Sequence, residues 1–174
     1  MPTPLHRLQG TSSGPRAPDN SSQLGVGTRG RGSELTAAPI WGISQQEYLA
    51  RADVWPLNPE GELLLGVKLE SPEGVAHCEE ILAVPGLGFA EIGPGDLGLS
   101  LGYTTIRNDP YPPEMQAARD RILAACKANK VPFLEACTPA NVAARIDEGV
   151  RVIAGHNPET ARIGRAHQKR KMPA

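Results

Sequence analysis

The chain has 174 residues, of which 40% are hydrophobic and 21% charged, a composition typical of one domain-sized protein with an apolar core. Its formal net charge of −1 gives no basis for nucleic acid or an anionic membrane as a main partner. The three cysteines are widely spaced and form no C-x-x-C pair, which argues against a disulfide framework or a zinc ribbon and predicts a reducing, cytoplasmic location.

The N-terminal segment, residues 1–39, differs in amino-acid composition from the rest of the chain. It is rich in Gly, Ser, Pro, Thr and Arg, has no aromatic residue and shows no apolar periodicity, so we expect a disordered tail. The sequence "TRGRG" within it could contact RNA or acidic surfaces, although a plain unstructured tail is the simpler interpretation. The segment has no signal-peptide pattern, and no apolar run in the chain approaches the roughly 20 residues of a membrane span. Residues 40–174 are expected to form the folded domain.

From Ile40 onward, helical and strand patterns alternate. A helix is expected at 44–53, where Ser44 and Glu47 form a capping box. The later elements, in chain order, are a strand at 63–70, a helix at 71–84, a strand at 88–93, an amphipathic helix at 112–130, a strand at 131–137, a helix at 138–149, a strand at 149–156 and a helix from 157.

These elements make four strand–helix units in series, which predicts an α/β fold with a parallel sheet covered by helices. Crossover connections in such sheets are right-handed, so the carboxyl ends of all strands face the same way. We therefore expect one mouth lined by Glu70, by Gly93–Asp96, by Cys137 with Thr138, and by Gly155 with His156. Both open α/β sheets and α/β barrels place their ligand sites at this end.

The glycine-rich stretch "GPGDLG" reads as G-x-G-x-x-G, but a dinucleotide site is not favoured. No helix is expected directly after it, since turn residues and three prolines follow, and Pro94 occupies its second position. Twenty residues beyond Gly98 lies Ala118, where that fingerprint requires an acid. A phosphate loop of the Walker type is excluded because no Gly-Lys-Ser/Thr occurs.

A metal site fits the same stretch better. Glu70 and Asp96 stand at the tips of successive strands, and adjacent parallel strands lie about 4.8 Å apart, so both carboxylates can reach one ion. Two oxygen ligands with open positions suit Mg²⁺ or Mn²⁺. The glycines beside Asp96 allow close approach of the backbone to a ligand. The alternative stays open that Glu70 only caps the helix at Ser71 and Asp96 only makes an Asx turn.

Two blocks of the sequence resemble the HpcH/HpaI aldolase family, which includes 2-keto-3-deoxy sugar acid (4-hydroxy-2-oxo acid) aldolases and relatives of the citrate lyase beta subunit. The blocks are "GVKLESPEGV" and "ILAVPGLGFAEIGPGDLGLSLG". The matching positions are Glu70, Glu73-Gly74-Val75, Val84-Pro85-Gly86 and Gly93-Pro94-Gly95-Asp96-Leu97. The match extends more loosely from about Trp41 to the C-terminus.

The resemblance implies a divalent-metal-dependent, class II aldolase or lyase on a (β/α)₈ TIM-type barrel. It implies that Glu70 and Asp96 bind Mg²⁺, Mn²⁺ or Co²⁺, which chelates a 2-oxo acid of the pyruvate or oxaloacetate type. Gly93, Pro94, Gly95 and Asp96 would form the substrate-binding loop, with the N–H groups of Gly95 and Asp96 on the carboxylate. Cleavage of the carbon–carbon bond would release an aldehyde and leave a pyruvate enolate, whose charge develops on an oxygen bound to the metal.

The chain departs from the family in having about four strand–helix units, which correspond to the second half of a barrel. In the family, the first half of the barrel supplies an arginine and a histidine to the site, and no position here matches either of them. His6 is expected in the N-terminal tail, His77 on an outer helix surface and His167 in a basic C-terminal tail. Neither His156 nor Arg107 fits the family pattern. The catalytic residues therefore stay unassigned.

Three hypotheses follow from this partial match. The chain is an active lyase domain, a truncated non-catalytic remnant that binds only metal and keto acid, or an interaction protein that works through its Arg/Gly-rich head. A half barrel would also leave two open strand edges, so we expect a homo-oligomer.

Overall fold

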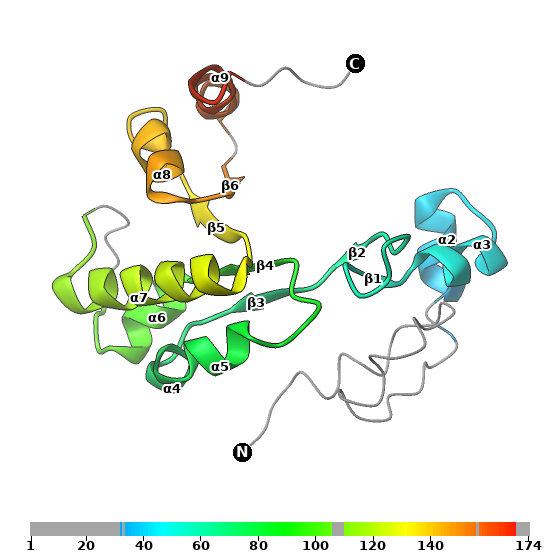
Figure 1. Cartoon of the computed structure of the whole chain (residues 1–174), viewed down its shortest axis with the longest axis horizontal. Coiled ribbons are helices and arrows are strands. Elements are labelled where there is room, and N and C mark those ends of the chain that lie inside the picture. The colour runs from blue at the N-terminus through cyan, green and yellow to red at the C-terminus, as the bar shows by residue number, and fades with distance from the viewer. Residues whose placement is uncertain (1–31, 33, 106–109, 156, 170–174) are drawn as a thin grey trace. The chain divides into compact units, whose positions relative to one another are not determined.

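The structure is a computed structural model that describes residues 32, 34–105, 110–155 and 157–169. The chain forms two compact units, one ending at Leu65 and the other beginning at Gly66. The elements are α2 (Glu34–Trp41), α3 (Gln45–Arg51), β1 (Val54–Trp55), β2 (Leu63–Leu64), β3 (Gly66–Lys68), α4 (Pro72–Ala76), α5 (Cys78–Leu82), β4 (Phe89–Glu91), α6 (Pro94–Ser100), α7 (Pro113–Asn129), β5 (Phe133–Ala136), α8 (Val142–Glu148), β6 (Val152–Ala154) and α9 (Pro158–His167) (Figure 1). No helix in these ranges is long and apolar enough to span a bilayer.

The first unit contains α2, α3 and the two-stranded parallel sheet of β1 and β2. Helix α3 begins as predicted, since the Ser44 hydroxyl accepts a hydrogen bond from the Glu47 N–H at 3.1 Å. The Trp41 and Tyr48 rings pack edge to face with centroids 5.0 Å apart, which ties α2 to α3. The Arg51 guanidinium, which binds Glu62, joins α3 to the segment before β2.

Two expected boundaries differ from the structure in this region. Helix α2 already covers 34–39, so the predicted limit between a tail of 1–39 and a domain of 40–174 falls inside a helix. The single strand predicted at 63–70 is divided: β2 pairs with β1, whereas β3 pairs with β4. The apolar run alone cannot show this division, because the partner of each strand is decided by tertiary contacts. The rest of the predicted tail, 1–31 and 33, lies outside the described residues.

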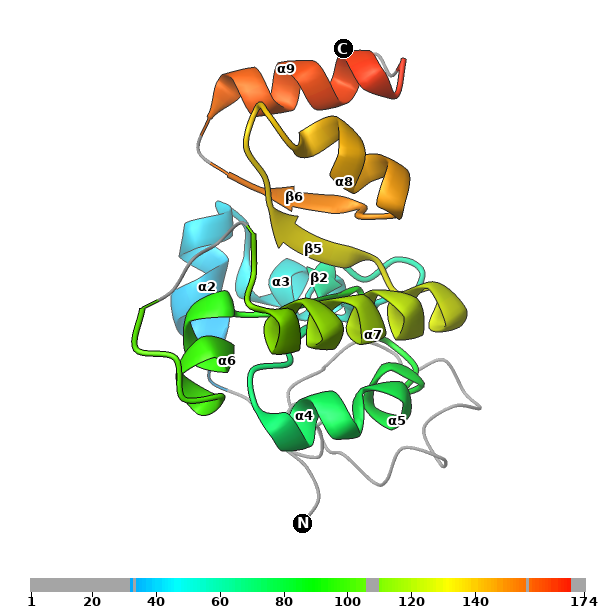
Figure 2. The same cartoon turned by 90° about the vertical axis from the view of Figure 1, so that its left-hand side faces the viewer.

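The second unit is a four-stranded parallel sheet in the order β3-β4-β5-β6, with helices between successive strands (Figures 1 and 2). This confirms the predicted α/β class and the four strand–helix units. The register pairs Lys68 with Glu91, Glu91 with Leu134, and Leu134 with Val152. Closure of such a sheet into a partial (β/α)₈ barrel stays a proposal, because four parallel strands also occur in open α/β folds.

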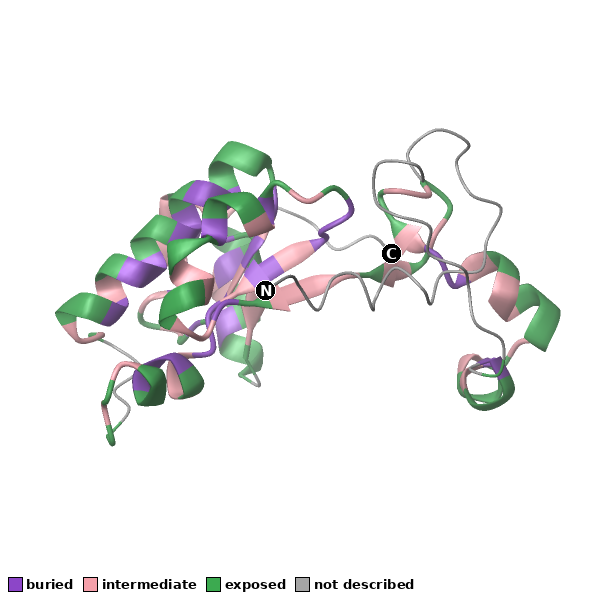
Figure 3. Cartoon of the chain, turned by 90° about the horizontal axis from the view of Figure 1, so that it is seen from below, coloured by how far each residue is buried: buried purple, intermediate pink, exposed green. Residues whose placement is uncertain are grey.

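The two faces of this sheet differ in burial. Side chains alternate between faces along a strand, and paired residues of parallel strands point the same way. One face carries the buried residues Leu69, Ala90, Ile92, Phe133 and Cys137 and is covered by helices (Figure 3). The opposite face, called the open face below, carries residues that are half-buried or exposed, namely Lys68, Phe89, Glu91, Leu134, Ala136, Val152 and Ala154.

The helices on the covered face follow the predicted pattern with two local differences. The predicted helix 71–84 is interrupted at His77, whose φ of −107° and ψ of 16° end α4 before α5 begins. The predicted helix 138–149 begins only at Val142, since Asn141 turns back to accept the Thr138 N–H at 2.8 Å. The serine cap and first-turn proline of α4 are confirmed, as Ser71 accepts the Gly74 N–H at 3.1 Å.

A buried ion-pair network joins α7, β5 and α8 behind the covered face. Arg119, which is 1% exposed, donates to both oxygens of Glu135 at 2.6 and 2.7 Å and to Glu148 at 2.7 Å. Arg145 adds a second cation at 3.0 Å from Glu148. Burial alone would lower the pKa of Arg119, but the hydrogen bonds and charge of Glu135 and Glu148 outweigh it and raise that pKa. Arg119 also contacts the exposed Asp120 at 3.1 Å, so each buried charge has an oppositely charged partner, which is the condition for charged groups inside a core.

We expect Glu135→Gln to lower the free energy of unfolding by about 3–5 kcal/mol, because it leaves a buried guanidinium without its bidentate partner. Urea denaturation followed by circular dichroism measures this change. The matched control is Glu159→Gln, which removes the same bidentate contact from an exposed pair with Arg162 and should leave the midpoint nearly unchanged. Equal effects of the two substitutions would contradict a structural role for the buried network.

Candidate functional site at the carboxyl ends of β3 and β4

The carboxyl ends of the four parallel strands face one edge of the sheet, as predicted (Figure 1). Glu70 follows β3 by two residues, and Gly93 follows β4 by two residues and caps α6. Cys137 and Gly155 stand at the ends of β5 and β6. His156 lies outside the described residues. The strand order makes β3 and β4 neighbours, so Glu70 and the glycine loop are brought together by backbone pairing alone.

The carboxylate of Glu70 lies directly against the backbone of Gly93. A Cβ atom added at Gly93 would overlap Oε1 of Glu70 and would approach its carboxyl carbon to 2.6 Å. Gly93 has an ordinary φ of −91°, so the absence of a side chain there serves this contact and not a special backbone angle. The Glu70 side chain therefore points toward the loop. It does not cap the following helix, because the cap is made by the Ser71 hydroxyl.

Oε1 of Glu70 is buried. Its partner is the ammonium group of Lys68, whose Nζ lies 2.8 Å from this oxygen. A buried carboxylate oxygen normally has a hydrogen-bond donor or a cation as its partner. Oε1 of Glu70 has the Lys68 ammonium in this role.

Asp96 lies in the first turn of α6, is exposed, and makes no hydrogen bond or ion pair within the described residues. Its position in the first turn is favourable for a negative charge. The N–H groups of Gly95 and Asp96 belong to the same turn and have no acceptor within the helix. No group of three or more His, Cys, Asp or Glu side chains in the described part of the chain is arranged to hold a metal ion. The structure thus brings the Glu70 carboxylate to Gly93, at the start of the turn that carries Asp96.

Lys68 and Glu91 extend this group along the open face, and the sequence-based prediction does not include them. Nζ of Lys68 lies 2.8 Å from Glu70 and 3.4 Å from Glu91. Glu70, followed by Glu91, raises the pKa of Lys68, which is therefore an ammonium ion at neutral pH. The proximity of Lys68 and Glu70 could be predicted from the sequence, because they are two residues apart in an extended segment and so share a face. The proximity of Lys68 and Glu91 could not, because it depends on the register between β3 and β4.

The prediction that no helix follows the glycine loop is wrong, since α6 begins at Pro94. A dinucleotide still has no place there. The Glu70 carboxylate occupies the approach to Gly93, where it would repel a pyrophosphate. Pro94 also removes one of the N–H groups that such a ligand needs.

The other predicted candidates lie elsewhere or are structural. His77 is exposed, as predicted, and its Nδ1 lies 3.6 Å from Glu80. His167 ends α9 and pairs with Asp147 at 2.7 Å, so it is more than a solvated tail residue. Cys137 is buried at the end of β5, and burial raises the pKa of its thiol to about 11, which makes it a poor nucleophile at neutral pH. His6 and Arg107 lie outside the described residues.

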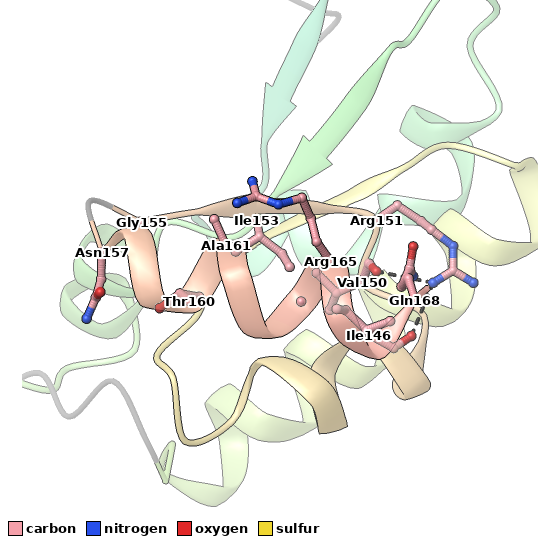
Figure 4. Close-up of a pocket in the computed structure, with 11 residues that line it drawn as sticks. Ile146, Val150, Arg151, Ile153, Gly155, Asn157, Thr160, Ala161, Arg165 and Gln168 are labelled. Atoms are coloured by element: carbon pink, nitrogen blue, oxygen red, sulfur yellow. Dashed lines mark hydrogen bonds between the residues drawn. The ribbon is translucent and has the colours of Figure 1, made fainter. Parts of the chain in front are cut away.

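A separate hollow of about 300 Å³ lies beside α9 (Figure 4). Its lining residues are Ile146, Val150, Arg151, Ile153, Gly155, Asn157, Thr160, Ala161, Gly164, Arg165 and Gln168. The guanidinium groups of Arg151 and Arg165 point in different directions, so they do not converge on one anion (Figure 4). Neither Glu70 nor Asp96 lines this hollow, so it is separate from the predicted metal site.

The sequence profile of the HpcH/HpaI aldolase/citrate lyase family matches residues 22–155. The chain belongs to this family. The match includes Glu70 and the whole Gly93–Asp96 loop, and it extends into the N-terminal segment that the sequence alone predicts as a tail.

Individual relatives agree with this assignment. A hydroxypyruvate/pyruvate aldolase of Pseudomonas aeruginosa is 40% identical over 93 residues, which are 53% of this chain and 31% of that protein. The crystal structure of a HpcH/HpaI aldolase/citrate lyase family protein from Burkholderia cenocepacia J2315 is 28% identical, with a TM-score of 0.57, over 88% of this chain and 55% of that one. A citrate lyase beta subunit from M. tuberculosis, complexed with oxaloacetate and magnesium, shares the fold at 18% identity and a TM-score of 0.51, over 59% of this chain and 51% of that one. The chain thus spans less than half the length of the curated family members it matches.

We expect Gly93→Ala to displace the Glu70 carboxylate while leaving the fold intact. The new Cβ would meet the movable end of Glu70, and φ at this position suits alanine, so the stability change should stay within about 1 kcal/mol. Titration calorimetry should show Mn²⁺ binding weakened as strongly as in Glu70→Gln. Gly74→Ala is the matched control, because its Cβ would make ordinary contacts from 3.5 Å outward. Unaltered Mn²⁺ affinity in Gly93→Ala would contradict the placement of Glu70.

Proposed function

We propose that this protein is a divalent-metal-dependent carbon–carbon lyase, a class II aldolase that acts on 2-oxo acids of the pyruvate or oxaloacetate type through a pyruvate enolate. The second product, or co-substrate, would be an aldehyde. The observation that carries the proposal is the Glu70 carboxylate: it rests on Gly93, at the start of the motif shared with the family, and its buried oxygen has the half-exposed ammonium of Lys68 as its partner.

The relatives support the reaction class. The name of the Pseudomonas aeruginosa protein states a pyruvate aldolase, and the M. tuberculosis structure contains oxaloacetate and magnesium. The donor set also fits a hard cation, since it consists of carboxylate oxygens. Lys68 neutralises one of the two charges of Glu70 and Glu91, and Asp96 adds a third carboxylate that has no partner within the described residues. This excess of negative charge favours a divalent ion such as Mg²⁺, Mn²⁺ or Co²⁺.

Each residue of the site has a separate task in this proposal. Glu70 and Asp96 hold the cation, which when bound supplies positive charge to the substrate oxygen on which negative charge develops. The N–H groups of Gly95 and Asp96 hold the substrate carboxylate, and Pro94 fixes the start of their turn. Gly93 gives the Glu70 carboxylate the room to face this loop. No proton-transfer group is assigned, because the histidines among the described residues pair with acids away from the site: His77 between α4 and α5 with Glu80, and His167 at the end of α9 with Asp147.

We further propose that a second copy of the chain covers the open face, as in a partial barrel completed by association. In this sheet β3 and β6 are edge strands, and unpaired strand edges recruit other chains. The open face also exposes apolar side chains, among them Val152 at 37% exposure. A homo-oligomer would bury these side chains and could bring further polar groups to the mouth.

We expect one Mn²⁺ site that is lost in both Glu70→Gln and Asp96→Asn, because each change removes one anionic ligand while keeping the size of the side chain. Titration calorimetry measures the affinity, and thermal unfolding confirms that each variant is folded. Glu73→Gln is the control, since this exposed acid belongs to the same sequence motif but lies in the first turn of α4. Full Mn²⁺ affinity in either of the first two variants would refute the ligand assignment.

We expect binding of metal and keto acid to outlast aldol cleavage in this chain. Without an assigned charge stabiliser and a proton-transfer group, the rate of cleavage should fall by roughly 10⁴–10⁷ relative to a site that has both. Metal-assisted decarboxylation of oxaloacetate demands less of those groups and should persist. Both reactions are measured in one preparation, with EDTA and with Mn²⁺ restored, and light scattering gives its oligomeric state. Rapid EDTA-sensitive aldol cleavage by a monomer would contradict this expectation.

A further inference from the structure

The ammonium group of Lys68 lies between two carboxylates on the open face of the sheet. Its Nζ is 2.8 Å from Oε1 of Glu70 and 3.4 Å from Oε1 of Glu91. The three residues come from two adjacent strands and share one face, because Lys68 pairs with Glu91 in the register and Glu70 is two residues further along. The Lys68 side chain is about half exposed, at 51%, whereas the two carboxylates are 25% and 22% exposed.

The position of this ammonium coincides with the place where the proposed function requires a metal. Oε1 of Glu70 is buried, and Lys68 is the cation nearest to it in the described residues. A divalent ion and an ammonium ion repel each other strongly when both lie within about 4 Å of one oxygen in a partly buried site. One of the two must leave when the other binds.

We propose that Lys68 is a built-in competitor for the metal at Glu70, and that Glu91 is the carboxylate that receives the ammonium when the metal enters. This inference rests on the proposed function, because it takes Glu70 as a metal ligand. The lysine keeps the acidic pair charge-balanced in the absence of metal. Glu91 keeps the displaced ammonium near the site, where its charge also faces an anionic substrate.

The exchange sets the metal affinity of the site. Occupancy then requires a divalent ion that binds Glu70 and Asp96 well enough to displace an internal cation, so monovalent ions such as Na⁺ and K⁺ are disfavoured. The site is thereby tuned toward divalent ions by a residue that does not ligate the metal. Lys68 is thus a specificity-determining residue of the proposed site.

The test is Mn²⁺ affinity, measured by titration calorimetry and by the electron paramagnetic resonance signal of free Mn²⁺. In Lys68→Met the metal no longer displaces an ammonium ion, and we expect the affinity to rise about tenfold, equivalent to roughly 1.4 kcal/mol. Lys68→Gln keeps a polar side chain and should show the same rise if Lys68→Met folds poorly. Lys127→Met removes the same charge from an exposed site in the same unit and should leave the affinity unchanged.

The role of Glu91 is separated by a double-mutant cycle. Glu91→Gln alone should weaken Mn²⁺ binding severalfold, because the ammonium then has Glu70 as its remaining carboxylate partner. In the Lys68→Met background the same change should have little effect. An equal loss in both backgrounds would show that Glu91 attracts the metal directly, and it would overturn the role given to Glu91 here.

The outcomes also separate this inference from the proposed function. Glu70-dependent Mn²⁺ binding that is unchanged or weakened in Lys68→Met and Lys68→Gln would overturn the competitor role and leave the metal site standing. An equal rise in Lys127→Met would show a general charge effect and would likewise overturn it. Absence of Mn²⁺ binding in the wild type, Lys68→Met and Lys68→Gln alike would overturn both proposals.

Discussion

The parallel pairing of β3 with β4 is the constraint on which the candidate site depends. This register sets Lys68 beside Glu91 and brings Glu70, two residues beyond β3, onto Gly93, two residues beyond β4. The Glu70 carboxylate fits there because Gly93 has no side chain. If the pairing slipped by one residue, the side chains of β3 would exchange faces and the acid would turn into the helix layer.

The sheet carries an ion-pair network on each face, and the two networks differ in a way that indicates their roles. Behind the covered face, Arg119 and Arg145 pair with Glu135, Glu148 and Asp120, and Arg119 and Glu135 are almost fully buried. On the open face, Glu70 and Glu91 share the single cation Lys68, so one negative charge is left over among these three residues. A buried network in which every charge has a partner is a structural feature, because loss of one partner would leave an uncompensated charge. An unbalanced, accessible one has electrostatic capacity left for a ligand.

Local patterns in the sequence were reliable where the deciding interaction is itself local. Ser44 and Ser71 cap their helices as predicted because the acceptor and the N–H group lie three residues apart. The long helix predicted at 112–130 is α7, whose buried residues recur at helical spacing. Failures occurred where distant residues decide: the run 63–70 was divided between two sheets, and a short helix formed at Pro94 in a stretch rich in turn residues.

The sequence by itself determined the α/β class, the four strand–helix units and the family, because periodicity and short motifs record these directly. The two carboxylates of the candidate site, Glu70 and Asp96, stay a prediction from the same motifs. Which carboxylates meet, and what neutralises them, was decided by the tertiary structure. Glu91 reads in the sequence as an ordinary strand residue, and the register alone places it within 3.4 Å of Lys68. The need for glycine at position 93 likewise appears only once Glu70 lies against it. The physical reason is that electrostatic and steric contacts depend on distance in space, and here those distances are set by strand pairing between residues more than twenty positions apart.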